Sequence, residues 1–240
     1  ERTFASLKEQ HRRDLINERL DQPYRQSQYF ARLLLERPSF TREALLAALE
    51  PLTLEDVRSY ARTFLKRTYV EGVVVGNLGR DEARAAIGQA LERLHAAVLP
   101  PERRVEPVVG EIPAQADWVF SERLAVNNSS MQFLYQVGRR EPALDAALAI
   151  IAKPLSEGFY HQMRTQQQLG YIVWAGAGDM RRMLNLYFVV QSAQYPADEL
   201  RKRMEGFIPS FQRTFQQLPE AAFEQYRNAV VRSKLERAEH

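Results

Sequence analysis

Apolar residues recur at helical spacing through most of the first hundred residues. Residues 4–35 follow this pattern, and an interruption is expected near Pro23 because proline removes a main-chain hydrogen bond from a helix. Thr41 can cap a second helix. Thr53 can cap a third, with Asp56 as its capping-box partner. The pattern therefore predicts a helical start to the chain, with two of its helix boundaries fixed by threonine.

A different pattern occupies residues 69–75. The run Tyr-Val-Glu-Gly-Val-Val-Val is rich in β-branched residues and ends at Gly76, which is typical of a buried strand. Asp81 then begins a helix that continues to Leu94.

Residues 99–116 lack hydrophobic periodicity. Four prolines occur there, Pro100, Pro101, Pro107 and Pro113. Proline-rich chain of this kind forms extended linkers, so we place a domain boundary in this segment. The expected organisation is one module in residues 1–98, a linker in 99–116 and a second module in 117–240.

The second module begins with predicted strands at 117–126 and 131–137, followed by helices at 143–152 and 155–164. A hairpin is expected next, with arms at 170–176 and 184–191 and its turn around Gly178 and Asp179. Two more helices begin at Pro196 and Pro219, the first kinked at Pro209. This order of strands and helices predicts an α+β fold in which helices layer on an antiparallel sheet.

The composition of the chain excludes several structural and functional classes. The chain has 240 residues, 45% of them hydrophobic, and no cysteine, which excludes disulfides, thiolate metal sites and a cysteine nucleophile. No apolar run is long enough to span a membrane, so we expect no membrane partner. The net charge of +3 is small and the arginine pairs are dispersed. We therefore expect no nucleic acid partner, although the pI of about 9.2 leaves an anion-binding domain as an alternative.

Familiar catalytic motifs are missing from the chain. Its four histidines, His11, His95, His161 and His240, are far apart in the sequence, and none belongs to a His-x-x-Glu-His or His-Glu-x-x-His helix. No Gly-x-Ser-x-Gly sequence supplies a serine nucleophile. From the residues alone the prediction stops at an α+β protein without a metal site of its own.

One segment carries a resemblance to a known family. The sequence Arg-Thr-Gln-Gln-Gln-Leu-Gly-Tyr-Ile-Val at residues 164–173 resembles the R-T-x-x-Q-L-G-Y-x-V segment of the insulinase/pitrilysin family of zinc metallopeptidases. Further similarity in the same order covers essentially the whole chain. It includes Gln22-Pro23, Thr53-Leu54, Gly76-Asn77-Leu78, Asn127-Asn128, Pro154 to Phe159 and Gln191-Ser192.

The resemblance implies a place within a longer protein. Long members of the family have four homologous α+β domains in two halves, and the N-terminal half carries His-x-x-Glu-His and zinc. Residues 1–98 resemble the later part of the third domain and residues 117–240 the earlier part of the fourth, so both modules are incomplete. The absence of a starting methionine likewise suggests an excised segment or a processed product. We expect this chain alone to be inactive and to bind no zinc, and the intact protein to be a zinc endopeptidase or oligopeptidase.

Arg164 and Tyr171 are the auxiliary catalytic residues that the resemblance implies. An arginine fork and a tyrosine hydroxyl can donate hydrogen bonds to substrate carbonyls and to a developing oxyanion. The alternative is structural, with Arg164 stabilised at a helix C-terminus and Tyr171 packed on a sheet.

The expected partners are the N-terminal catalytic half and peptide substrates. The alternative function is that of an inactive homologue that serves in assembly. Bacterial relatives point to the periplasm, and the cytoplasm is the alternative location.

Overall fold

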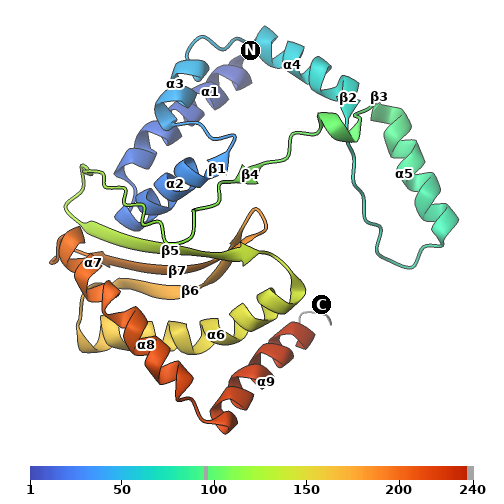
Figure 1. The fold of residues 1–240 in the computed structure, drawn as a ribbon. Coiled ribbons are helices and arrows are strands. Elements are labelled where there is room, and N and C mark those ends of the chain that lie inside the picture. Colours follow the sequence, from blue (N-terminus) through green and yellow to red (C-terminus); the bar gives the residue numbers. More distant parts are fainter. Residues whose placement is uncertain (95–96, 237–240) are drawn as a thin grey trace. The chain divides into compact units, whose positions relative to one another are not determined.

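The computed structural model describes residues 1–94 and 97–236, and its chain divides into two compact units (Figure 1). The first unit comprises Glu1–Leu15 and Phe40–Glu106, and the second comprises Ile16–Ser39 and Pro107–His240. Residues 16–39 thus pack with the C-terminal part of the chain. The sequence predicts two incomplete homologous domains, residues 1–98 and 117–240, joined by a linker at 99–116. That prediction is about homology to other domains, which the contacts within this chain do not test, so it stays a prediction.

The first unit is mainly helical. It contains most of α1 (Arg2–Asn17), with α3 (Arg42–Leu49), α4 (Leu54–Lys66) and α5 (Arg80–Leu94). The two-residue strands β2 (Arg67–Thr68) and β3 (Ala97–Val98) pair in parallel, and a short 3₁₀ turn, η2, covers Pro101–Arg103. The Lys8 ammonium donates to the carbonyl oxygens of Glu50 and Leu52, at 2.7 and 2.9 Å, and so ties α1 to the end of α3.

Both threonine caps are confirmed. The Thr41 hydroxyl accepts from the main-chain N–H of Ala44 at 3.1 Å. At the start of α4 the Thr53 hydroxyl accepts from the N–H of Asp56 at 3.2 Å, and the Asp56 carboxylate accepts from the N–H of Thr53 at 2.8 Å. This is the complete reciprocal capping box.

The buried strand expected at 69–75 is wrong. The chain there is extended but unpaired, and the side chains of Val73 and Val75 are 89% and 88% exposed. A strand needs a neighbour for its main-chain N–H and C=O groups. No described segment provides a pairing partner for these residues.

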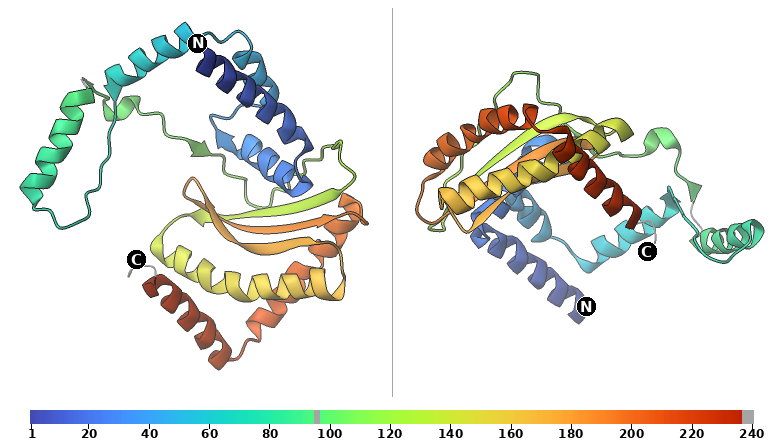
Figure 2. Two further views of the ribbon diagram at one scale, coloured as in Figure 1. Left: turned by 180° about the vertical axis from the view of Figure 1, so that it is seen from behind. Right: turned by 90° about the horizontal axis from the view of Figure 1, so that it is seen from below.

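The second unit is built on a three-stranded antiparallel sheet. Its strands are β5 (Ser129–Arg139), β6 (Ile172–Met180) and β7 (Met183–Ser192), in the order β5-β7-β6. The helix α6 (Pro142–Tyr160) covers one face, and α2 (Pro23–Leu35) covers the other, as Figure 1 and the left view of Figure 2 show. The remaining elements are η1 (Glu18–Leu20), the paired β1 (Glu36–Arg37) and β4 (Val108–Val109), α7 (Ala197–Glu205), α8 (Phe207–Gln216) and α9 (Glu220–Glu236).

The core of this unit lies between the sheet and α6, α7 and α8. Phe159 of α6 contacts Phe188 of β7 and Phe207 of α8, with ring centroids 5.3 and 5.1 Å apart. All three side chains are buried. This helix-on-antiparallel-sheet arrangement confirms the α+β fold class.

Three features of this unit differ from expectation. No strand forms at 117–126, because no described strand pairs with that segment. The two helices expected around Pro154 are the single helix α6, since Leu155 and Phe159 pack in the core directly after the proline. The helix after Pro196 is interrupted at Gly206 rather than at Pro209, which lies in the first turn of α8, where a missing N–H costs little.

The hairpin turn also lies elsewhere than at Gly178 and Asp179. Met180 pairs with Met183, which leaves Arg181 and Arg182 as a two-residue loop. Both have positive φ, 49° and 68°, as a type I′ turn requires. The main-chain N–H of Arg182 donates to the Asp179 carboxylate at 3.1 Å, which helps to hold arginine in a conformation that usually favours asparagine or glycine.

Candidate functional site

The segment that carries the family resemblance begins in a π-helix. After α6 the chain continues as His161–Gln166 with π geometry, and the N–H of Gln167 donates to the carbonyl of Gln162, five residues earlier, at 3.0 Å. Such turns arise when one extra residue is accommodated in an α-helix, and they are frequent at functional sites. Helical periodicity alone gave no sign of it.

A short connection then leads from the π-helix to β6. Gln168 has a φ of 52°, which reverses the chain, and the N–H of Leu169 donates back to the carbonyl of Met163 at 3.0 Å. Met163 and Leu169 are both buried. The two anchors fix the path between Arg164 and Tyr171.

Gly170 allows the chain to meet the end of β7. A Cβ atom at this position would lie 1.8 Å from the main-chain oxygen of Gln191, so that no other residue fits without a backbone shift. The glycine of the motif is therefore explained by a close main-chain approach.

The side chain of Gln191 joins two segments that share the family resemblance. Its Nε2 donates to the Gln22 side-chain oxygen at 2.6 Å, and its Oε1 accepts from the main-chain N–H of Tyr24 at 3.0 Å. Gln191 is buried. The start of α2 is thereby held next to the connection that precedes Tyr171.

The structure brings Arg164 and Tyr171 together. The guanidinium carbon of Arg164 lies 5.2 Å from the centroid of the Tyr171 ring, a cation–π contact. Tyr171 is 86% exposed, so it does not pack on the sheet as the structural alternative requires. Arg164 does lie near the end of a helical segment, which agrees with the alternative that it is stabilised at a helix C-terminus. Neither side chain makes a hydrogen bond or ion pair within residues 1–94 and 97–236.

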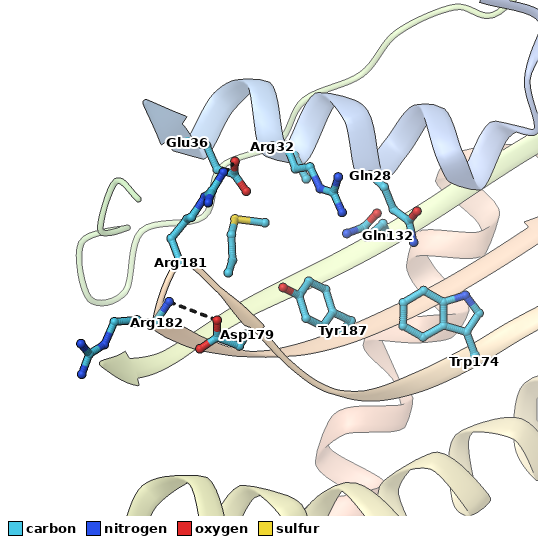
Figure 3. A pocket seen from close by; sticks show the side chains of 11 residues that line it. Gln28, Arg32, Glu36, Gln132, Trp174, Asp179, Arg181, Arg182 and Tyr187 are labelled. Carbon is cyan, nitrogen blue, oxygen red and sulfur yellow. Dashed lines mark hydrogen bonds and ion pairs between the residues drawn. The ribbon is translucent and has the colours of Figure 1, made fainter. Parts of the chain in front are cut away.

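A pocket of about 680 Å³ lies between α2 and the opposite face of the sheet from α6 (Figure 3). Gln28 and Arg32 of α2 project towards the sheet, where Trp174 and Tyr187 form part of its floor. Burial raises the pKa of the Tyr187 phenol, an effect that Asn185 and Arg32 partly offset. This pocket was not predicted from the sequence, although period-2 alternation does place Trp174 and Tyr187 on the sheet face away from the core.

A metal site does not form among the described residues. No three His, Cys, Asp or Glu side chains in that part of the chain come close enough to hold an ion. His95 and His240 lie outside the described residues. The described helices also include none long and apolar enough to cross a bilayer.

Comparisons with known proteins agree with this fold. Residues 150–240 match the family described as PQQ synthase PqqF-like, C-terminal lobe domain 4. The insulin-degrading enzymes of Drosophila melanogaster and Homo sapiens are 29% and 27% identical over 99% of this chain and 24% of their own length. The crystal structure of pitrilysin matches with a TM-score of 0.74 and 20% identity, over 95% of this chain and 24% of that chain.

The fold and these similarities define a segment of a metallopeptidase-family protein. Together they support the insulinase/pitrilysin family for this chain, as part of the C-terminal half of its members. It spans about a quarter of the length of the curated relatives it matches.

Proposed function

We propose that this chain is a substrate-enclosing part of a zinc-dependent endopeptidase or oligopeptidase. It would contribute Arg164 and Tyr171 to an active site that is completed by an N-terminal half of the same protein. The observation that carries the proposal is the pairing of these two side chains, with the Arg164 guanidinium carbon 5.2 Å from the Tyr171 ring centroid. The similarity to insulin-degrading enzymes supports the reaction class.

The chemistry of the pair suits peptide hydrolysis. Attack on a peptide carbonyl places negative charge on its oxygen, and positioned donors that face this oxygen lower the barrier. The Tyr171 hydroxyl can donate one hydrogen bond, and the Arg164 fork can hold a substrate carbonyl with two. Because neither side chain has another hydrogen-bond partner in the described part of the chain, both donors are available to a substrate.

Zinc would act from outside this chain. Bound zinc would act as a Lewis acid, and the family resemblance implies that its ligands lie in the N-terminal half. The described residues offer no ligand group for it. The contribution of this chain is therefore limited to binding, orienting and hydrogen-bonding the peptide.

The test is kinetic and uses the full-length protein. Tyr171→Phe should lower kcat about 10²-fold, the usual scale for one oxyanion donor. The thermal midpoint should stay unchanged, because the hydroxyl is exposed and bonded to no described group. Tyr160→Phe is the matched control, since Tyr160 is also exposed, at 50%, near the end of α6, and it should keep normal kcat.

Two outcomes would contradict the proposal. Normal kcat in Tyr171→Phe would remove the catalytic role of the tyrosine. A full-length protein without His-x-x-Glu-His and without peptidase activity would instead support the inactive assembly module.

A further inference from the structure

The pocket between α2 and the sheet has the size of a ligand site. Its volume of about 680 Å³ lies within the range of about 300 to 1,000 Å³ that is common for bound small molecules and short peptide segments. All of its lining residues belong to the second unit. The pocket is separate from the Arg164 and Tyr171 pair, since neither of those residues lines it.

Two glycines of β6 lie next to the lining residues Trp174 and Tyr187. Gly176 and Gly178 follow Trp174 at every second position, so all three lie on the strand face that points towards α2, and Gly176 pairs with Tyr187. A Cβ at Gly176 would meet no atom within 4 Å, so that a side chain there would occupy free space. A Cβ at Gly178 would lie 2.8 Å from the Tyr187 ring. The missing side chain therefore lets Tyr187 lie across the strand.

The charges at the pocket are unequally paired. Three arginines and two carboxylates line it, an excess of one positive charge. Arg181 pairs with Glu36 at 3.7 Å, and Asp179 lies 4.0 Å from the guanidinium of Arg140, which does not line the pocket. The Arg32 guanidinium makes no hydrogen bond or ion pair with any described residue, and it points from α2 into the pocket, whereas the Arg182 side chain points away from it (Figure 3).

The pocket wall also holds an unused amide. The Oε1 atom of Gln132, on β5, is buried and has no hydrogen-bond partner in the described chain. A buried polar atom without a partner is unfavourable unless a ligand or water satisfies it. The Gln28 side chain faces Gln132 from α2 (Figure 3). The side-chain amides of Gln28 and Gln132 could therefore donate hydrogen bonds to, and accept them from, the main chain of a bound peptide.

We propose that this pocket binds a peptide by its carboxylate, with Arg32 as the anion-binding group. Gln28 and Gln132 bond the peptide main chain, and Trp174 packs against an apolar side chain of the ligand. A single excess positive charge matches one carboxylate better than a multiply charged phosphate. The choice of peptides as ligands rests on the proposed function.

The test measures binding without turnover. Calorimetric titrations of the full-length protein, with divalent metal chelated, compare acetyl-Ala-Gly-Phe as the free acid with its C-terminal amide. A third peptide, acetyl-Ala-Glu-Phe amide, carries the carboxylate on a side chain. We expect at least one of the two carboxylate peptides to bind at least about 10-fold more tightly than the neutral amide, because a charge-assisted hydrogen bond is lost in the latter. The third peptide decides whether the carboxylate is C-terminal or on a side chain.

Variants locate the binding. Arg32→Gln should weaken the Kd at least about 10-fold. Gly176→Val should weaken binding as well, because its side chain would enter the open space beside Trp174 and Tyr187. Arg25→Gln is the control, because Arg25 lies on the same helix, is exposed and pairs with Asp21 at 3.3 Å. It should leave the Kd within about 2-fold.

Equal binding of the neutral amide and both carboxylate peptides, or normal binding by Arg32→Gln, would overturn the carboxylate site. Inorganic pyrophosphate that binds more tightly than any of the peptides would overturn the choice of ligand. Since binding is measured without catalysis, loss of the Tyr171 assignment would leave this result unchanged, and the reverse also holds.

Discussion

Gly170 and Gln191 meet main chain to main chain, at a distance that leaves no room for a side chain. A Cβ on residue 170 would lie 1.8 Å from the Gln191 carbonyl oxygen and 2.8 Å from its carbonyl carbon. The contact joins the residue before Tyr171 to the end of β7. The position of the exposed tyrosine is thereby set by two backbones rather than by side-chain packing.

Gly170→Ala should destabilise the protein by about 1–3 kcal/mol, the usual cost of forcing extra atoms into a closely packed site. The backbone shift should also move Tyr171 and lower kcat in the full-length protein. Thermal unfolding and kinetics measure the two effects. Gly176→Ala is the control, because its Cβ enters open space, and it should change the midpoint little. Equal midpoints for both variants would show that the close approach is absent.

Arg164→Ala should raise KM and lower kcat in the full-length protein. The guanidinium can hold a ground-state carbonyl as well as the transition state, so that its loss affects both parameters. Stability should fall by no more than about 1 kcal/mol, since the side chain is partly exposed and its contact is with an exposed ring. A large loss of stability with normal turnover would favour the structural role at the helix C-terminus.

Thr53→Ala should lower the free energy of unfolding by about 1 kcal/mol, because it removes the cap of α4. Ser59→Ala, at an exposed position inside the same helix, is the control and should not destabilise. Chemical unfolding followed by circular dichroism measures both. Equal stability of wild type and Thr53→Ala would mean that the capping box contributes nothing.

The same cap predicts a dependence on pH. Hydrogen bonds from the Thr53 hydroxyl and then from its main-chain N–H lower the pKa of Asp56 below the ordinary value of 3.8. The carboxylate thus stabilises the folded state above pH 3.8, and this contribution disappears as the pH falls through the lowered pKa. An NMR titration of Asp56 should give a lower pKa in wild type than in Thr53→Ala. Identical values would refute this link.

Replacing Arg181 by Asn and Arg182 by Gly should stabilise the second unit by about 1 kcal/mol. Both positions have positive φ, which costs most residues about 1–2 kcal/mol and suits Asn-Gly. Asp179 can still accept from the main-chain N–H of residue 182. Thermal unfolding measures the gain, and an unchanged or lower midpoint would contradict the turn assignment.

Local signals in the sequence predicted the helix starts well. The caps at Thr41 and Thr53 each join groups three residues apart, so the sequence holds all the needed information. Arg164 and Tyr171 were selected through a family resemblance, and their contact depends on the short, anchored connection between them. Their catalytic role stays a prediction.

Strands were predicted less well because they depend on distant partners. The segments 69–75 and 117–126 have suitable residues, but a ladder forms only where another strand pairs. The pocket was not predicted because it also depends on residues that are distant in the sequence. Arg32 and Tyr187 are 155 positions apart and become neighbours only when α2 packs on the sheet.

The π-helix at His161–Gln166 makes the number of residues before Tyr171 matter as much as their identity. Removing one residue there would restore ordinary α geometry and turn the preceding positions by about 100° relative to those that follow. Arg164 would then leave the face it shares with Tyr171, although every letter of the motif could still be present. Insertions and deletions in this turn are therefore a stricter marker of divergence among related chains than substitutions within it.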